Sequence, residues 1–405
     1  MPAQKPSYQT ITEQDYTAIS GPDWPNYADF AQGIELDQFV IDELDNMLRE
    51  TAINNQRVNN FCVLPFYAVE YPANVACCLL PKDVDLKSVQ QNMLVGQRPQ
   101  ECSACWILED RNLLSDRLIK NRTLDYYTDI DITQLFKQAE QNKHAINHYK
   151  VAASNFCNST CVTCNSNSST AWGELEQAYK GIDKHLWNIK PTDDVFDIDY
   201  KSAKFISFTG GESTMIRAHW DIVEQLHLAG NHTCCLSFVT NGSFNLTSRQ
   251  IKLLSKFSNV NFCFSIDGIG PVFEYLRYPL SWSKIEQNIK FCQDHNIMVS
   301  ASYTISNLNI YYHDITVNWF QTKSIPYNYN LVYTPTYFRP TALTLEIKQK
   351  ILLKKQHPNI VSLLSQPTTE QDQTNYAEFR KQLQLQDQMK NISIEQYLPE
   401  LFSLF

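Results

Sequence analysis

The chain has 405 residues, of which 43% are hydrophobic and 19% are charged, and its net charge is −9 at pH 7. This composition is typical of a soluble globular protein with one large domain and an extension, or with two domains. The acidic balance argues against a general nucleic-acid binder, whose surface is normally basic.

No export signal is recognisable at the start of the sequence. Residues 1–10 are polar and lack the charged start and apolar core of a signal peptide, and no apolar run approaches about 18 residues. We therefore expect a cytoplasmic protein that does not span a membrane. In that compartment the twelve cysteines are more typical of metal binding or free thiols than of disulfides.

The first part of the chain divides into three predicted segments. Residues 1–60 form an extension in which apolar residues recur at helical spacing over 36–53. Residues 61–125 form a cysteine-rich module, and the polar stretch 121–150 is a predicted linker with one helix.

Strands alternate with helices over residues 149–335, which predicts an α/β domain built on a parallel sheet. Strands are predicted at residues 149–156, 204–208, 234–239, 261–265, 297–305 and 329–333. Helices are predicted at 216–228, 247–256 and 283–295, the second and third with Thr-x-x-Gln and Ser-x-x-Glu capping boxes. Residues 336–405 are expected to close the chain as a helical region.

Three cysteines follow the strand predicted at 149–156: Cys157, Cys161 and Cys164, in the spacing C-x3-C-x2-C. A closed structural zinc site takes four ligands, so three thiolates leave one metal position open. Thiolates also suit iron–sulfur clusters. A zinc site completed by a distant histidine, or cysteines in a core, are the other interpretations.

This cysteine spacing resembles the signature of the radical S-adenosylmethionine superfamily. The resemblance implies a [4Fe–4S] cluster held by Cys157, Cys161 and Cys164, whose free iron chelates the amino and carboxylate groups of S-adenosylmethionine. Reductive cleavage by way of a flavodoxin- or ferredoxin-type reductant would yield a 5′-deoxyadenosyl radical, which abstracts hydrogen from a substrate. The implied fold is a partial (β/α)6 TIM-like barrel, with its active site beyond the carboxyl ends of the strands.

Gly210, Gly211 and Glu212 follow a predicted strand and open a helix. Two glycines let a ligand approach the backbone closely, and a carboxylate can bind an ammonium group. Placed one β/α unit after the cysteines, the element resembles the Gly-Gly-Glu of the superfamily, which contacts the methionine amino group of the cofactor. Taken alone, it also suits an ordinary strand-to-helix turn.

Other candidate cofactor contacts lie near strand ends: Phe156, Asn241, Ser265, Asp267, Arg277 and Asn307. The Asn241-Gly and Asp267-Gly pairs resemble the family pattern and would face the adenosyl group or the substrate, although both pairs also make plain tight turns. Arg277 would pair with the cofactor carboxylate, or is a solvated or structural arginine. Phe156 would shield the cluster, or belongs to the core.

A second group of cysteines precedes the barrel: Cys62, Cys77, Cys78, Cys102 and Cys105. A terminal C-x2-C with two earlier cysteines can close around one metal centre. The module resembles the SPASM and twitch auxiliary-cluster modules. In SPASM the opening is C-x9-to-15-G-x4-C, and here proline replaces the glycine and the alignment favours Cys77 over Cys78.

This module precedes the barrel instead of following it, and it lacks the later cysteines of SPASM. The resemblance therefore implies one auxiliary iron–sulfur cluster, held by Cys62, Cys77, Cys102 and Cys105, and a four-thiolate zinc knuckle is the alternative. The remaining cysteines have no ligand spacing and are expected in the core: Cys234, Cys235, Cys263 and Cys292.

Together these resemblances imply a radical S-adenosylmethionine enzyme acting on a peptide or protein. Crosslinking, epimerisation, oxidation and excision, as in the maturation of ribosomally made peptides, all stay open. One alternative is a radical dehydrogenase or modifying enzyme acting on a small molecule or carbohydrate. A second is a non-enzymatic zinc-binding protein. The acidic balance argues against a nucleic-acid substrate.

Overall fold

The computed structural model describes residues 59–77, 79–81, 83–110, 115–122, 124, 130–181, 185–191, 196–332, 334–354, 358–365 and 367–405. The helix predicted at 36–53 and the residue Cys78 lie outside these ranges. Among the described residues, no helix combines the length and apolar character that crossing a bilayer requires.

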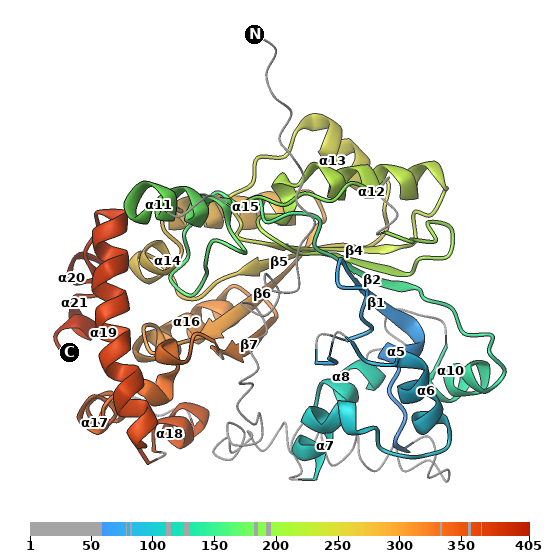
Figure 1. Cartoon of the computed structure of the whole chain (residues 1–405). Helices are drawn as coiled ribbons and strands as arrows, with labels where there is room; N and C mark the ends of the chain where they lie inside the picture. Colours follow the sequence, from blue (N-terminus) through green and yellow to red (C-terminus); the bar gives the residue numbers. More distant parts are fainter. Residues whose placement is uncertain are drawn as a thin grey trace.

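Seven parallel strands form a single sheet in which the spatial order follows the sequence (Figure 1). The strands are β1 Ala68–Tyr71, β2 His148–Val151, β3 Phe205–Phe208, β4 Cys235–Thr240, β5 Val260–Ser265, β6 Met298–Ile305 and β7 Tyr327–Leu331. In the described part of the chain β1 and β7 are not paired, so the sheet is a partial barrel of the α/β class. Strands β2 to β7 confirm the predicted strands.

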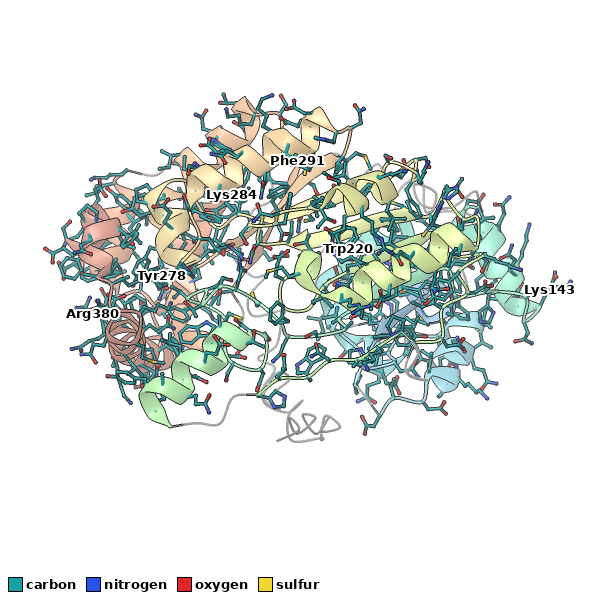
Figure 2. The ribbon with its side chains drawn as sticks, turned by 90° about the horizontal axis from the view of Figure 1, so that it is seen from above. Lys143, Trp220, Tyr278, Lys284, Phe291 and Arg380 are labelled. Carbon is teal, nitrogen blue, oxygen red and sulfur yellow. The ribbon has the colours of Figure 1, made fainter. Side chains whose placement is uncertain are left out.

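Helices connect successive strands, as parallel pairing requires. They are α11 Thr170–Lys180, α12 Arg217–Leu228, α13 Ser248–Leu254, α14 Pro271–Leu276, α15 Trp282–Asp294 and α16 His313–Thr322. Figure 2 looks down on helices α12 and α15, where Trp220 and Phe291 lie over the sheet. Stacked aromatic rings of Phe208, Phe238 and Trp220 fill the space between α12 and the strands.

One predicted helix cap is confirmed and the other is wrong. The Thr247 hydroxyl accepts a hydrogen bond from the Gln250 amide, and the Gln250 side chain returns the bond, which is the predicted capping box. Helix α15 begins one residue earlier than predicted, at Trp282, so Ser283 lies inside it. Its first amide donates to Glu274 Oε1 at 2.9 Å, because α14 supplies the cap that the local sequence does not.

Strand β1 comes from the cysteine-rich module and was not predicted. It pairs with β2 from Ala68↔His148 to Tyr71↔Val151. Ala68 belongs to the hydrophobic core of the module, whereas Tyr71 belongs to the core of the barrel, so the two cores meet along this strand. The module also contains α5 Leu64–Tyr67, α6 Leu86–Leu94, α7 Ser103–Glu109, α8 Asp116–Arg122 and α10 Ile132–Glu140.

The C-terminal region is helical, as predicted. It comprises α17 Leu345–Leu352, α18 Pro358–Leu364, α19 Glu370–Lys390, α20 Ile394–Tyr397 and α21 Pro399–Phe402. The long helix α19 stands beside α11, on the flank of the barrel away from the cysteine-rich module (Figure 1). Arg380 on α19 and Lys143, just after α10, mark these two flanks in Figure 2.

Candidate functional site

The thiols of Cys157, Cys161 and Cys164 lie together beyond the carboxyl edge of the sheet. We call residues 157–164 the cysteine loop. The Ser159 hydroxyl lies 3.3 Å from both Cys157 Sγ and Cys161 Sγ, and all three cysteines are half-buried. Burial, with the neighbouring thiols adding to it, raises the pKa of Cys164 to about 12. The thiols that the spacing grouped in sequence are therefore grouped in space.

Gly210 and Gly211 lie against the backbone that leads into the cysteine loop. A Cβ atom on Gly210 would meet the Ser154 carbonyl oxygen at 2.4 Å, and one on Gly211 would meet the Phe156 carbonyl oxygen at 2.3 Å. Gly210 also has a φ of +105°, which other residues rarely adopt. The glycines thus permit a close approach, but the approaching group in this structure is the protein's own chain.

Glu212 is fully buried, and protein donors surround its carboxylate. Oε1 accepts from the Thr214 amide and from the hydroxyls of Thr214 and Thr240, and Oε2 accepts from the Asn241 amide at 2.6 Å. Burial raises the pKa of Glu212, while these hydrogen bonds act the other way. The carboxylate therefore ties the end of β3 to the end of β4.

Asn241 extends this tie to the cysteine loop. Its side-chain amide donates to Asn158 Oδ1 at 2.9 Å, and Asn158 donates in turn to the Ser243 hydroxyl. Ser243 closes the ring by donating to Asn241 Oδ1 at 2.7 Å. The predicted cofactor contact at Asn241 thus positions Asn158, the residue next to Cys157.

His219 was not singled out from the sequence, yet it joins two segments of the site. It is fully buried on α12, where Nε2 accepts from the Ala153 amide at 3.3 Å and Nδ1 lies 2.9 Å from the Ser213 carbonyl oxygen. This pairing requires the neutral ring with its proton on Nδ1. Burial lowers the pKa of His219 to about 4.

Arg277 and Asp267 form a buried ion pair, with 2.7 Å between Nη2 and Oδ2. Arg277 Nη1 also lies 3.8 Å from Cys161 Sγ, and Asp267 Oδ1 accepts from the Thr304 amide. Of the interpretations given for Arg277, a structural arginine agrees with these contacts and a solvated one is wrong. The pair connects the end of β5 to the cysteine loop.

The other candidate contacts differ in exposure. Phe156 is 43% exposed, so a core role for it is wrong. Ser265 is half-buried at the end of β5, and Asn307 is fully buried after β6, where its amide nitrogen donates to the Tyr337 carbonyl. Phe156 and Asn307 follow the ends of β2 and β6, and Ser265 ends β5. All three therefore lie at the carboxyl edge of the sheet, as predicted.

Several buried polar atoms near this edge have no hydrogen-bond partner in the described structure. They are Ser213 Oγ, Arg277 Nε and Asn307 Oδ1. Buried polar groups are normally satisfied, so these three unpaired atoms need an explanation. A ligand that carries both donors and acceptors would supply the missing partners.

The four thiols predicted as auxiliary ligands line one pocket of the cysteine-rich module. We call this set, Cys62, Cys77, Cys102 and Cys105, the cysteine pocket; it encloses about 20 Å³ and is also lined by Glu101, Asp116 and Arg117. Burial raises the pKa of Cys62, and raises that of Cys102 to about 12. Four cysteines up to 43 positions apart in sequence, from Cys62 to Cys105, therefore converge here.

A buried ion pair holds the walls of the cysteine pocket. Arg117 is bonded to Glu109 through Nε and Nη2, and its Nη1 donates to the carbonyls of Asn59 and Phe61. Its guanidinium carbon lies 4.6 Å from the ring centre of Trp106, which follows Cys105. This network fixes the backbone on either side of the pocket.

The cysteine loop and the cysteine pocket lie at opposite ends of the sheet. Cys157 follows the carboxyl end of β2, whereas Cys62 precedes the amino end of the neighbouring β1. Tyr67, the residue before β1, is an electrostatic neighbour of Cys234, which precedes the amino end of β4. The pocket is therefore not part of the carboxyl-edge site.

The remaining cysteines do not form a ligand set. Cys234 and Cys292 are fully buried, as expected of core residues, while Cys235 and Cys263 are half-buried on their strands. Across the described residues, no three His, Cys, Asp or Glu side chains have the arrangement of a preformed site for a single metal ion. Within each of the two sets, the cysteine loop and the cysteine pocket, the thiols lie near one another. In neither set do three of them already have the mutual distances that binding a single metal ion requires.

No protein-family model matches the sequence, and no curated protein matches it. Among solved structures, native anSMEcpe with bound AdoMet and Kp18Cys peptide is similar, with 19% identity and a TM-score of 0.36 over 50% of this chain and 57% of that chain. Streptococcus suis SuiB bound to precursor peptide SuiA is similar with 12% identity and a TM-score of 0.36, over 67% of this chain and 62% of that chain. The match thus spans less than two thirds of either protein. At such scores the likeness does not define the function, which has to be argued from the site.

Glu212→Ala should lower the free energy of unfolding by about 3 kcal/mol or more, because it leaves several buried donors without an acceptor. Urea unfolding followed by circular dichroism measures this. Glu224→Ala is the matched control: that residue pairs with Arg249, whose side chain is 80% exposed, and its loss should cost less than about 1 kcal/mol. Equal losses in the two variants would contradict the role given to Glu212.

Stability should fall as the pH drops below about 6.5, because His219 must stay neutral in the folded protein. The stability that neutral His219 contributes is complete above the pKa of this histidine in the unfolded chain. It is lost as the pH falls toward the pKa of His219 in the folded protein, which is about 4. Between pH 6.5 and pH 5, the free energy of unfolding of His219→Gln should fall by about 1.6 kcal/mol less than that of the wild type. Urea titrations of the metal-free protein at both pH values test this, and equal losses would refute it.

Arg117→Ala should lower the free energy of unfolding by about 3 kcal/mol, because it leaves the Glu109 carboxylate buried without its ion-pair partner. Arg98→Ala is the control, since Arg98 also stacks on Trp106 but pairs with an exposed Asp110. Arg98→Ala should lower the free energy of unfolding by about 1 kcal/mol or less. Hydrogen exchange of residues 60–68 would report the difference, and unchanged exchange in Arg117→Ala would rule out the proposed support of the pocket.

Proposed function

We propose that this chain is a radical S-adenosylmethionine enzyme whose [4Fe–4S] cluster is held by Cys157, Cys161 and Cys164. When bound, that cluster supplies the electron that cleaves S-adenosylmethionine into methionine and a hydrogen-abstracting 5′-deoxyadenosyl radical. The observation that carries the proposal is the grouping of three thiols on one loop, tied by hydrogen bonds to the carboxyl ends of the neighbouring strands. Three protein ligands leave a coordination position for a substrate or cofactor.

Of the residues around the cysteine loop, we assign some to holding the loop in place and others to binding the cofactor. Glu212 and Asn241 are occupied by protein partners, so we assign them to holding the loop instead of gripping the cofactor directly. Ser213, Arg277 and Asn307 each offer an unpaired buried atom, a hydroxyl, a donor and an acceptor respectively. S-adenosylmethionine carries the amino, carboxylate and hydroxyl groups that would satisfy such atoms.

The cysteine pocket is the proposed auxiliary site, with Cys62, Cys77, Cys102 and Cys105 as ligands. Because it lies at the amino end of β1, away from the cysteine loop, we do not assign it to the lining of the substrate groove; its proposed roles are electron transfer and structural support. The space of about 20 Å³ admits one group the size of a water molecule, which keeps a single zinc ion as the alternative to an iron–sulfur cluster.

A peptide or protein is the proposed substrate class, and the support for it is the resemblance of the cysteine-rich module to SPASM and twitch modules. An auxiliary centre suits a reaction that removes an electron from a substrate radical, such as an oxidative crosslink or a dehydrogenation. A small molecule or carbohydrate dehydrogenated in the same way is the second candidate.

Anaerobic reconstitution with iron and sulfide, followed by iron counting, tests the proposal. The wild type should hold about eight irons, and the triple variant Cys157→Ala/Cys161→Ala/Cys164→Ala about four. With dithionite and S-adenosylmethionine, only the wild type should release 5′-deoxyadenosine. Cys263→Ala, which removes a half-buried thiol outside both sets, is the control and should keep the full iron content.

Two results would contradict parts of the proposal separately. A fully loaded wild type that makes no 5′-deoxyadenosine would exclude the radical function. Bound zinc that disappears in Cys102→Ala/Cys105→Ala, with about four irons retained, would leave the radical function intact and replace the auxiliary cluster by a zinc site.

A further inference from the structure

Lys390, the last residue of α19, contacts two side chains that bind the cysteine loop, although it is more than 220 residues away from that loop in sequence. Only 5% of it is exposed. A buried ammonium group is costly unless charge or hydrogen bonds compensate it, so its surroundings need an account.

Two neighbours of Lys390 grip the backbone of the cysteine loop. Lys390 Nζ donates to Gln386 Oε1 at 3.0 Å, and the Gln386 amide donates to the Val162 carbonyl at 2.9 Å. Nζ also lies 4.7 Å from the ring centre of Trp172, whose indole nitrogen donates to the Cys161 carbonyl at 2.9 Å. Lys390 thus connects the two side chains that fix the backbone between the second and third cysteines.

The charge of Lys390 has no carboxylate partner in the described structure. Asp387, one turn earlier, accepts instead from the Tyr275 hydroxyl and the Ile394 amide. Burial lowers the pKa of Lys390 to about 8, and its electrostatic neighbours Cys161, Asp387 and Cys164 act the other way.

The other cation near the loop is differently placed. Arg277 also approaches Cys161, but its charge is balanced by the ion pair with Asp267. Among the described residues, Lys390 is therefore the cation near the thiols that makes no ion pair. Negative charge on Cys161 and Cys164, which a bound cluster requires, would supply the missing counter-charge.

We propose that Lys390 is a positioning residue of the cysteine loop, which holds its backbone through Gln386 and Trp172 and stabilises the reduced form of the bound cluster with its charge. This inference rests on the proposed function. Reduction adds a negative charge to the cluster, and net charge around a cluster is one determinant of its reduction potential. Removing the ammonium should therefore disfavour the reduced form.

Redox titration of the reconstituted full chain tests the inference. Electron paramagnetic resonance follows the reduced signal that is absent from the triple cysteine variant of the loop. Lys390→Met keeps the length of the side chain but not its charge, and Lys390→Arg keeps the charge. Lys381→Met is the matched control on the same helix, because the Lys381 side chain is 73% exposed.

At a fixed applied potential, Lys390→Met should lower the ratio of reduced to oxidised cluster about tenfold, a shift of about 59 mV for one electron. Lys390→Arg and Lys381→Met should stay within about twofold of the wild type. If Lys390→Met retains no cluster, Lys390→Gln, which keeps a hydrogen-bond donor for Gln386, is titrated with the same expectation.

A neutral variant whose cluster has the wild-type potential would overturn the inference, even if its iron content falls, since that result describes a purely structural lysine. A wild type that binds no iron at the cysteine loop would instead defeat the proposed function, and the inference with it. The iron count before titration separates the two cases.

Discussion

The site depends on one buried carboxylate. Glu212 leaves β3 just as the strand ends, and its oxygens are held by donors from its own turn and from the end of β4. Such a group is stable in an apolar interior only while its hydrogen bonds are complete, so the two strand ends cannot move apart independently. The glycines before it bring the entry to the cysteine loop within backbone contact of this anchor. That contact is the first constraint on the position of the thiols.

A second layer of constraints acts from greater distances in the sequence. The His219 ring on α12, the Arg277–Asp267 pair after β5 and the Gln386 amide on α19 each contact the segment 153–162. They approach it from different sides, and each uses a different chemistry. A loop held in this way can keep three thiols oriented without a fourth protein ligand.

Much of this could be predicted from the sequence, for identifiable physical reasons. The strands β2 to β7 are apolar runs bounded by turn residues, and the cysteine spacing grouped the loop thiols correctly. The grouping of Cys62, Cys77, Cys102 and Cys105 was also predicted, and these four line one pocket. Strand β1 was missed because four residues after a one-turn helix carry too little periodicity to be recognised.

The roles of single residues were harder to predict, since they depend on partners that only folding brings near. Glu212 looks in the sequence like a free carboxylate after two glycines, and only the fold reveals Thr240 and Asn241 beside it. His219 and Lys390 lie on helices whose patterns show only that one face is buried. Ser283 looked like a cap because the local motif fits, but Glu274 from the preceding helix takes that role.

The contribution of β1 also bears on how the protein could be shortened. Without residues 61–125, β2 would become the edge of the sheet, with a row of unpaired amides and carbonyls along His148–Val151. Bare edges of that kind recruit strands from other molecules, so a chain reduced to its barrel would be prone to aggregate. The cysteine-rich module therefore acts as a cover for the barrel edge, whatever its four thiols bind.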